Sequence, residues 1–263
     1  MKILKASLQA LSFASLMMLS SCGTESGEIG PASPGGGSGS TGSGASGQGG
    51  SLGRFAVADD YLYVIDGEEL RQFKLADPAN PKSHNQLPIT ITPETLFPMG
   101  DSLLLVGGTQ GMAAYSLGND GRIRLEGTYV HVTSCDPVVA NETHAFVTLR
   151  STTQGVCAGW VNELQALDIR NLSQIRQIDA LAMDFPLGLG LKHNEDLVLV
   201  CAGNGLQSVD VRDPTNLEVV QTFPEIEGRD LIVLPNDLVL VLTPSGLEQY
   251  RFRNGDMNFL SEL

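Results

Sequence analysis

The sequence is poor in basic residues. It contains 16 Lys and Arg against 30 Asp and Glu, which leaves a formal net charge of -14. Nucleic-acid binding depends on clustered positive charge, and an anionic membrane surface repels an acidic domain. The composition therefore argues against nucleic acid as a partner, and against direct adsorption of the folded part to a membrane.

Long apolar runs are also scarce. One stretch, residues 6–19, approaches a membrane segment, and as a helix it would cover roughly 21 Å of the ~30 Å hydrocarbon core. Two lysines precede it and small residues follow it, which is the layout of a bacterial secretory signal. We therefore expect a cleaved signal peptide at residues 1–21 rather than a permanent transmembrane helix.

Residues 19–22 read Leu-Ser-Ser-Cys, which resembles the lipobox of bacterial lipoproteins. The resemblance implies cleavage before Cys22 and acylation of that cysteine, with an ordinary cleavage site beside a chance cysteine as the alternative. Gly23 stands where an aspartate would signal retention in the inner membrane, which favours the outer membrane of the cell envelope. Removing residues 1–21 takes away two lysines and no acids, so the mature chain carries 14 - 30 = -16.

The next stretch is too polar and too rich in glycine to form a core. Residues 23–53 contain 13 Gly, 7 Ser and no aromatic residue. A Gly/Ser coil of this length has an end-to-end distance of roughly 30 Å. With the lipidated cysteine, residues 22–54 are therefore predicted to be a disordered tether, or a low-complexity expansion whose length has no role.

The remainder, residues 55–263, is a repeat. Five acidic or polar anchors each precede a short apolar run, with spacings of 41, 42, 53 and 41 residues. A second run with alternating apolar positions follows each anchor, and an Asp or Asn stands seven residues beyond the start of that run. The anchors are Asp60, Asp101, Thr143, Asp196 and Asp237, and the turn residues are Asp77, Asn119, Asn171, Asp213 and Asn254.

Each unit therefore reads as four short strands, and no segment has a sustained helical period. Four strands in about 41 residues is the size of a propeller blade. We predict an all-β, five-bladed β-propeller over residues 55–263. The first strand, residues 55–58, and the last, residues 257–262, complete their own blades, so we expect the ring to close by packing the first blade on the fifth.

Two units carry a more specific pattern. Residues 164–168 read Leu-Gln-Ala-Leu-Asp and residues 206–210 read Leu-Gln-Ser-Val-Asp, and each leads to an Asp or Asn turn. They resemble the LVIVD repeat of predicted bacterial surface propellers, which implies an exported repeat scaffold and no particular reaction. The other units have Lys74, Ser116 and Arg251 where the motif ends in aspartate.

The third unit is longer by 53 - 42 = 11 residues, inserted around residues 151–160. An exported protein permits disulfides, so we pair Cys135 with Cys157. Trp160, the one tryptophan of the chain, lies on this insertion and is a candidate ligand contact, or it packs on its own blade. Cys201 replaces an aliphatic residue of the repeat and is expected to be a buried thiol. No cysteine–histidine spacing fits a zinc site.

Acidic residues are the remaining candidates for chemistry. Glu94, Asp136 and Asp230 stand seven residues before three of the anchors, and Asp184 lies near the corresponding place in the fourth unit. Equivalent offsets place the first three around one mouth of the channel. They could bind a divalent cation or a sugar, or they could simply be solvated.

We therefore expect a monomeric, lipid-anchored propeller that binds a protein or glycan partner without catalysis and needs no cofactor. Two alternatives remain open. One is a carboxylate-dependent glycan hydrolase in the channel, for which the aromatic content of 6% is low. The other is a purely structural scaffold of the envelope.

Overall fold

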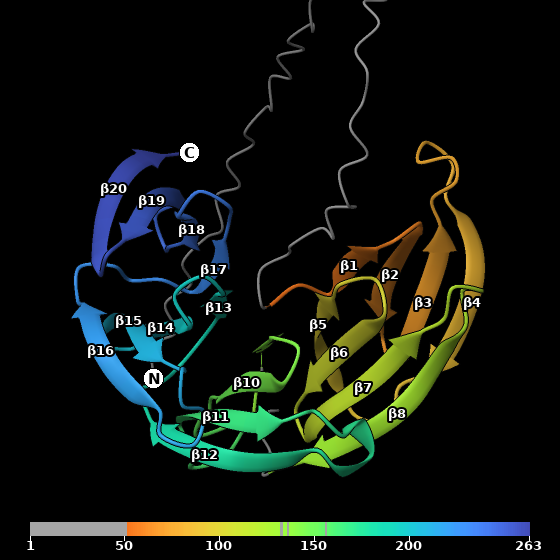
Figure 1. Cartoon of the computed structure of the whole chain (residues 1–263), viewed down its shortest axis with the longest axis horizontal. Helices are drawn as coiled ribbons and strands as arrows, with labels where there is room; N and C mark the ends of the chain where they lie inside the picture. Colours follow the sequence, from red (N-terminus) through yellow and green to blue (C-terminus); the bar gives the residue numbers. More distant parts are fainter. Residues whose placement is uncertain (1–51, 132–133, 136, 156) are drawn as a thin grey trace, which may run out of the picture. The chain divides into compact units, whose positions relative to one another are not determined.

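The structure is a computed structural model that describes residues 52–263 except 132–133, 136 and 156. These residues form five antiparallel sheets, each of four strands that follow one another in the chain. This is the five-bladed propeller that the repeat predicts. In Figure 1 the sheets succeed one another in chain order, with the first strand of each innermost.

The strands are short, and one 3-10 helix accompanies them. Sheet 1 contains β1 (Phe55–Ala58), β2 (Tyr61–Asp66), β3 (Glu69–Lys74) and β4 (Lys82–Pro88). Sheet 2 contains β5 (Pro93–Met99), β6 (Leu103–Gly108), β7 (Gly111–Leu117) and β8 (Ile123–Val130). Sheet 3 contains β9 (Val138–Ala140), β10 (His144–Leu149), β11 (Glu163–Asp168) and β12 (Arg176–Ala182). The helix η1 (Leu172–Gln174) lies in the connection between β11 and β12. Sheet 4 contains β13 (Leu189–Lys192), β14 (Leu197–Ala202), β15 (Gly205–Asp210) and β16 (Glu218–Phe223). Sheet 5 contains β17 (Asp230–Val233), β18 (Leu238–Leu242), β19 (Leu247–Arg253) and β20 (Asp256–Glu262).

The anchors mark the start of the second strand in every sheet. There a backbone carbonyl accepts a hydrogen bond of 2.7–3.0 Å from the amide just after, or at the end of, the third strand. The acceptor is the anchor itself in four sheets and Ser102, the residue after the anchor, in sheet 2. The donor–acceptor pairs are Leu75–Asp60, Leu117–Ser102, Ile169–Thr143, Val211–Asp196 and Phe252–Asp237.

Every sheet also has a register shift between its third and fourth strands, at the same place in the repeat. In each unit the shift follows the residue that stands five positions before the Asp or Asn of the predicted turn. The residue pairs are Gln72/Phe73, Ala114/Tyr115, Ala166/Leu167, Ser208/Val209 and Gln249/Tyr250. A bulge strengthens the local twist, so each outer strand turns away from the strands inside it.

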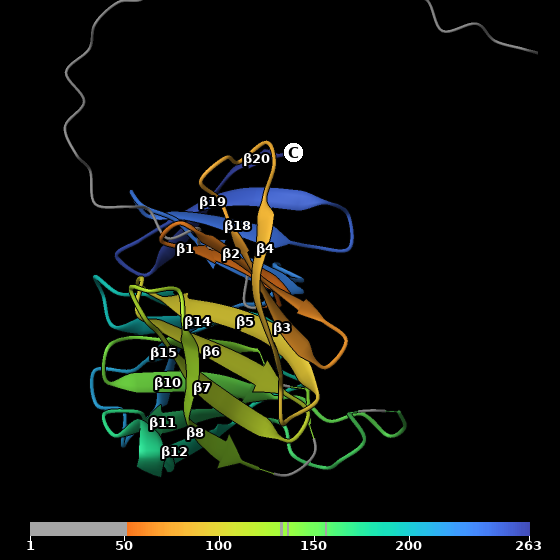
Figure 2. The same ribbon diagram turned by 90° about the vertical axis from the view of Figure 1, so that its right-hand side faces the viewer.

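Four hydrophobic clusters hold the sheets together, one between each two sheets that are consecutive in the chain. They join sheets 1 and 2, sheets 2 and 3, sheets 3 and 4, and sheets 4 and 5. Successive side chains of a strand point to opposite faces, so one sheet serves two clusters. In β14, for example, Val198 packs toward sheet 3 and Leu199 toward sheet 5. Figure 2 shows sheets 1, 2 and 3 lying face against face.

The expected packing of sheet 1 against sheet 5 is not found among the described residues, because none of their clusters joins these two sheets. The positions that would form it are partly exposed, as at Leu62 in β2 and Leu240 in β18. The segment before β1 contacts sheet 5 and sheet 2 instead. Leu52 N donates to Asp230 Oδ2 at 3.3 Å, and Gly53 O accepts from Leu96 N at 2.7 Å.

Candidate functional site

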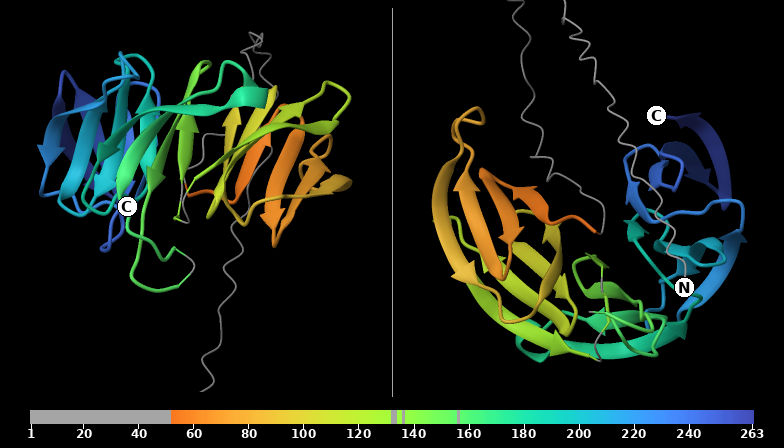
Figure 3. Two further views of the ribbon diagram at one scale, coloured as in Figure 1. Left: turned by 90° about the horizontal axis from the view of Figure 1, so that it is seen from below. Right: turned by 180° about the vertical axis from the view of Figure 1, so that it is seen from behind.

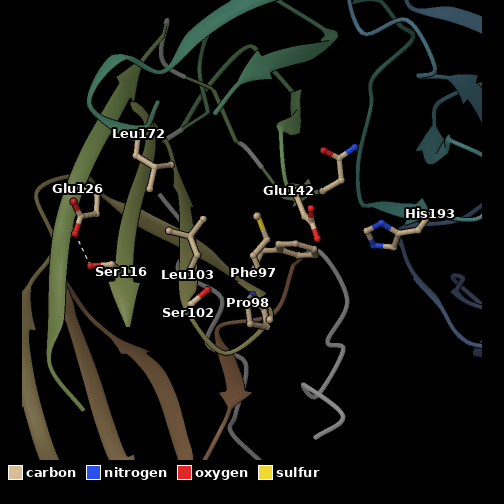
Figure 4. Close-up of a pocket in the computed structure, with 13 residues that line it drawn as sticks. Phe97, Pro98, Ser102, Leu103, Ser116, Glu126, Glu142, Leu172 and His193 are labelled. Atoms are coloured by element: carbon tan, nitrogen blue, oxygen red, sulfur yellow. Dashed lines mark hydrogen bonds between the residues drawn. The ribbon is translucent and has the colours of Figure 1, made fainter. Parts of the chain in front are cut away.

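A cavity of about 830 Å³ lies between sheets 2 and 3 and reaches His193, the residue after β13 of sheet 4. It opens where the first and second strands of these sheets connect, which we call the turn side. Its lining is Phe97, Pro98, Met99, Gly100, Ser102, Leu103, Ser116, Glu126, Ala140, Asn141, Glu142, Leu172 and His193. Figure 4 draws these residues around the cavity.

One part of the lining is apolar. Phe97 and Met99 lie on β5, Leu103 lies on β6 and Leu172 lies in η1, and all four are half-buried side chains at the edge of the cluster that joins sheets 2 and 3. β5 ends at Met99 because Gly100 turns the chain with a φ of +55°. The cavity is thus an opening into the hydrophobic packing between two blades.

Polar groups lie on both sides of this apolar floor. On one side Ser116 Oγ donates to Glu126 Oε1 at 2.5 Å. On the other side Glu142 and His193 approach each other, as Figure 4 shows. Asn141 Oδ1 fixes the turn that carries Glu142 by accepting from the amides of Thr143 and His144 at 3.0 and 2.8 Å.

The cavity lies beside a departure from the repeat motif. Ser116 occupies the position where sheets 3 and 4 have Asp168 and Asp210. Those aspartates bind the arginine two residues later, since Arg170 donates to both oxygens of Asp168 and Arg212 donates to Asp210 in the same way. The equivalent of that arginine in sheet 2 is Gly118. Sheet 2 therefore lacks the aspartate–arginine pair of sheets 3 and 4, although a cavity of about 390 Å³ also lies beside the pair of sheet 4.

The aspartates of sheets 3 and 4 are locked in structural roles. Asp168 is largely buried and also contacts Arg176 at 3.0 Å. The hydrogen bonds from Arg170 hold the pKa of Asp168 well below its usual range, and Arg212 lowers the pKa of Asp210 in the same way. Both carboxylates are therefore ionised at neutral pH and already paired, so they are poor candidates for ligand binding.

The arrangement in the cavity suits binding better than catalysis. The hydroxyl of Ser116 is engaged by a carboxylate and not by an imidazole, so it is not activated as a nucleophile. The two carboxylates, Glu126 and Glu142, are both exposed rather than desolvated. Such groups attract a cation or accept hydrogen bonds from hydroxyl groups while the apolar floor takes the body of a ligand.

Three acids, Glu94, Asp136 and Asp230, are predicted to share one mouth of the channel. Among the described residues, no cluster that brings them together is found. Asp136 itself lies outside the described residues. Glu94 Oε1 lies 3.1 Å from Cys135 Sγ, and Asp230 accepts from the backbone of Leu52 and Leu231. Asp184 contributes its backbone carbonyl, which accepts from Gly203 N at 2.6 Å. A cation site formed by all three acids stays a prediction.

A small cavity lies among four of the inner strands. The cavity among the inner strands β5, β9, β13 and β17 has a volume of about 10 Å³ and is lined by apolar residues, including Phe97, Val139 and Leu189. Such a space holds about one water molecule. A sugar ring does not fit there.

The insertion of the third unit spans the connection between β10 and β11 and projects on the side opposite to the turn side (Figure 3). A disulfide joins Cys135 to Cys157 at its base, with the Cα atoms 5.2 Å apart. Trp160 is 95% exposed, so it does not pack on its own blade. Its role as a ligand contact stays a prediction. Cys201 is a buried free thiol, as expected, and burial raises its pKa.

Sequence reasoning missed the cavity because its lining comes from three units of the repeat. The loss of the motif aspartate at Ser116 does not locate the cavity, because Lys74 and Arg251 replace the same aspartate in two other units. Cys22 and the tether lie outside the described residues. Within the described part of the chain, no helix is long and apolar enough to cross a membrane.

No protein-family model and no curated protein matches the sequence. Solved structures do. A functionally unknown protein from Desulfotomaculum acetoxidans is 13% identical, with a TM-score of 0.65 over 79% of this chain and 68% of that one. A protein from Lactobacillus plantarum is 14% identical, with a TM-score of 0.63 over 78% of this chain and 69% of that one. A virginiamycin B lyase from Staphylococcus aureus is 10% identical, with a TM-score of 0.55 over 79% and 68%. At such identities the likeness shows the fold alone.

Proposed function

We propose that this protein is a lipid-anchored propeller of the bacterial cell envelope that binds a ligand or partner without catalysis. The observation that carries the proposal is the cavity of about 830 Å³ between sheets 2 and 3, whose apolar floor lies between two exposed carboxylates. Sites for small molecules are concave and mostly apolar, with a few polar groups that orient the ligand.

The lining favours a ligand with an apolar body and a cationic or hydroxyl group. Phe97, Leu103 and Leu172 offer apolar contact, and Glu126 and Glu142 offer negative charge. The acidic chain as a whole adds a field that attracts cations. An amine attached to an aromatic or aliphatic body, or a basic peptide segment of a protein partner, has this chemistry.

The envelope location rests on the first residues of the chain. The lipobox-like residues before Cys22, the Gly/Ser tether and the resemblance to LVIVD repeats all favour an exported, anchored scaffold. Gly23 favours the outer membrane. We propose that the domain acts as a monomer that reaches away from the membrane on its tether, and that the lipid is its one contact with the bilayer.

Mass spectrometry of the protein from its host tests the anchor. The mature chain should begin at an acylated Cys22, and Cys22→Ala should leave the protein unprocessed or release it from the membrane fraction. An unacylated mature chain that starts elsewhere would remove this part of the proposal and leave the cavity unaffected.

The hydrolase alternative is less favoured by the described residues. A glycosidase needs two carboxyl groups facing each other across the sugar. Glu94 lies beside a disulfide, and Asp230 is bonded to backbone amides. The alternative of a purely structural scaffold predicts that the large cavity binds nothing.

Titration calorimetry with three matched probes tests the binding proposal on the full chain. Phenylbutylamine, phenylbutanol and phenylbutyrate share one apolar body and differ in charge. The amine should bind best and the carboxylate worst. Met99→Lys places an ammonium group at the cavity and should abolish binding of the amine, whereas Val220→Lys adds the same charge on the exposed strand β16 and should not. No heat from any probe would favour the scaffold.

A further inference from the structure

Three potential metal ligands, Glu94, Cys135 and Cys157, lie close together at the base of the insertion. One ligand atom from each residue lies within 4.8 Å of the other two. We propose that reduction of the Cys135–Cys157 disulfide converts this cluster into a binding site for a zinc-like divalent metal, with two thiolates and the Glu94 carboxylate as ligands.

The chemistry of the donor set supports the metal class. Two thiolates and one carboxylate are ligands that Zn²⁺ accepts, and three protein ligands leave a fourth position for water. Ligand atoms in a tetrahedral site with Zn–S of ~2.3 Å and Zn–O of ~2.1 Å lie about 3.4 to 3.8 Å apart. The Glu94 Oε1 to Cys135 Sγ distance of 3.1 Å is near this spacing, and the two sulfurs, bonded in the disulfide, can reach it by side-chain rotation once the S–S bond is broken.

The carboxylate lies directly against the sulfur. Glu94 Oε1 is 3.1 Å from Cys135 Sγ. The disulfide leaves both sulfurs without a proton to donate and without a charge to bind metal. In the oxidised protein the contact is therefore between a carboxylate and a neutral sulfur, whereas in the reduced protein the same geometry places a third ligand beside two thiols.

Backbone hydrogen bonds hold both cysteines in place independently of the disulfide. Cys135 and Arg150 exchange two backbone bonds of 3.1 and 3.2 Å. Cys157 O accepts from Thr152 N at 2.8 Å, and Ser151 N donates to Asn162 Oδ1 at 3.1 Å. These bonds remain when the S–S bond breaks, so the thiols stay together.

The reaction balances as follows. A dithiol reductant transfers two electrons and two protons to the sulfurs of Cys135 and Cys157 and becomes a disulfide itself. Binding of the divalent metal then releases the two thiol protons to solvent. The disulfide thus blocks the site, and the redox state of the surroundings determines whether the protein holds metal.

Cobalt binding to the full chain tests the proposal. The protein is reduced with a phosphine, which becomes its oxide with an oxygen from water, freed of reductant under nitrogen, and titrated with Co²⁺. Reduced wild type should bind one Co²⁺ per site with the charge-transfer absorption of cobalt thiolates, and Zn²⁺ should displace it. Oxidised wild type should show none of this absorption.

Three controls isolate the ligands. The double variant Cys135→Ser, Cys157→Ser keeps Cys22 and Cys201 and should lose the signal, and reduced wild type alkylated before titration should lose it as well if the double variant folds poorly. Glu94→Gln should keep the thiolate absorption but bind Co²⁺ at least about tenfold more weakly. Equal affinity in Glu94→Gln, or a signal that survives loss of both cysteines, would overturn the proposed site.

Discussion

Aspartate and serine occupy the same position of the repeat with different consequences. Asp168 and Asp210 are each paired with an arginine two residues later, which ties the end of the third strand to the following turn. Ser116 has no such arginine, and the space beside it is part of the cavity. Sheets 3 and 4 thus carry an ion pair at the position where sheet 2 has a serine that lines the cavity.

The stability of the protein should depend on pH through Asp168. Its pKa in the folded state is below the ordinary value of 3.8 because Arg170 binds the carboxylate. Stabilisation by this pair is therefore complete well above pH 3.8 and is lost as pH falls below 3.8 toward the lower folded-state pKa. Asp168→Asn should lower the melting temperature at pH 7, and the difference from wild type should shrink steadily as pH falls below 3.8. Thermal unfolding across this range checks it, and Asp256→Asn, an exposed acid with no such pair, is the control.

Turn residues were predictable because their side chains act locally. The predicted turns at Asp77, Asn171 and Asp213 are confirmed by a side-chain oxygen that accepts from the amide two residues later, at 3.0 to 3.2 Å. Glu94 shows the opposite case. Its partner Cys135 is 41 residues away, just before β9 of sheet 3, and no local pattern indicates that contact.

At the scale of elements, the strands follow the alternation of apolar residues. The predicted first strand, residues 55–58, coincides with β1, and the apolar runs after the anchors coincide with the second strands within two residues. The register shift common to all five sheets was not predictable, because any of several residues in a four-strand unit can be the extra one. The insertion was predictable in place and in its disulfide.

The disulfide should stabilise the insertion measurably. It closes a loop of 22 residues, which corresponds to roughly 3 kcal/mol in the chain-entropy model. We expect Cys135→Ser with Cys157→Ser to lower the free energy of unfolding by up to that amount and to speed proteolysis around Trp160. Denaturant unfolding with limited proteolysis checks this, and Cys201→Ala, which removes a thiol outside the disulfide, is the control. An unchanged cleavage rate would show that backbone hydrogen bonds alone hold the insertion.

For the whole molecule, five sheets in chain order follow from the repeat, whereas the junction between the first and last sheets does not. The four clusters join consecutive sheets, and none of the described residues forms a fifth cluster. Sequence patterns show which face of a strand is apolar. They do not show whether the free faces of the first and last sheets meet, because in the sequence these faces carry apolar residues, as do the faces that pack on a neighbouring sheet.

This arrangement predicts unequal costs for two similar substitutions. Leu199 is fully buried between sheets 4 and 5, and Leu240 lies on the outer face of sheet 5 and is partly exposed. Leu199→Ala should destabilise the protein by about 2 to 5 kcal/mol, and Leu240→Ala by about 1 kcal/mol or less. Denaturant unfolding of both variants measures the difference. Equal losses would mean that sheets 1 and 5 pack together in solution.

The most direct test of the proposed binding role is to measure the affinity of phenylbutylamine for the protein after the two carboxylates of the cavity have been neutralised. Calorimetry would compare wild type, Glu126→Gln with Glu142→Gln, and Glu218→Gln with Glu225→Gln, which removes two acids away from the cavity. Exposed ion pairs contribute up to about 1 kcal/mol each, so the cavity variant should bind roughly tenfold more weakly while the control variant binds like wild type. Equal affinity in all three proteins, or no binding to wild type, would contradict the proposal that this cavity binds an apolar, cationic ligand.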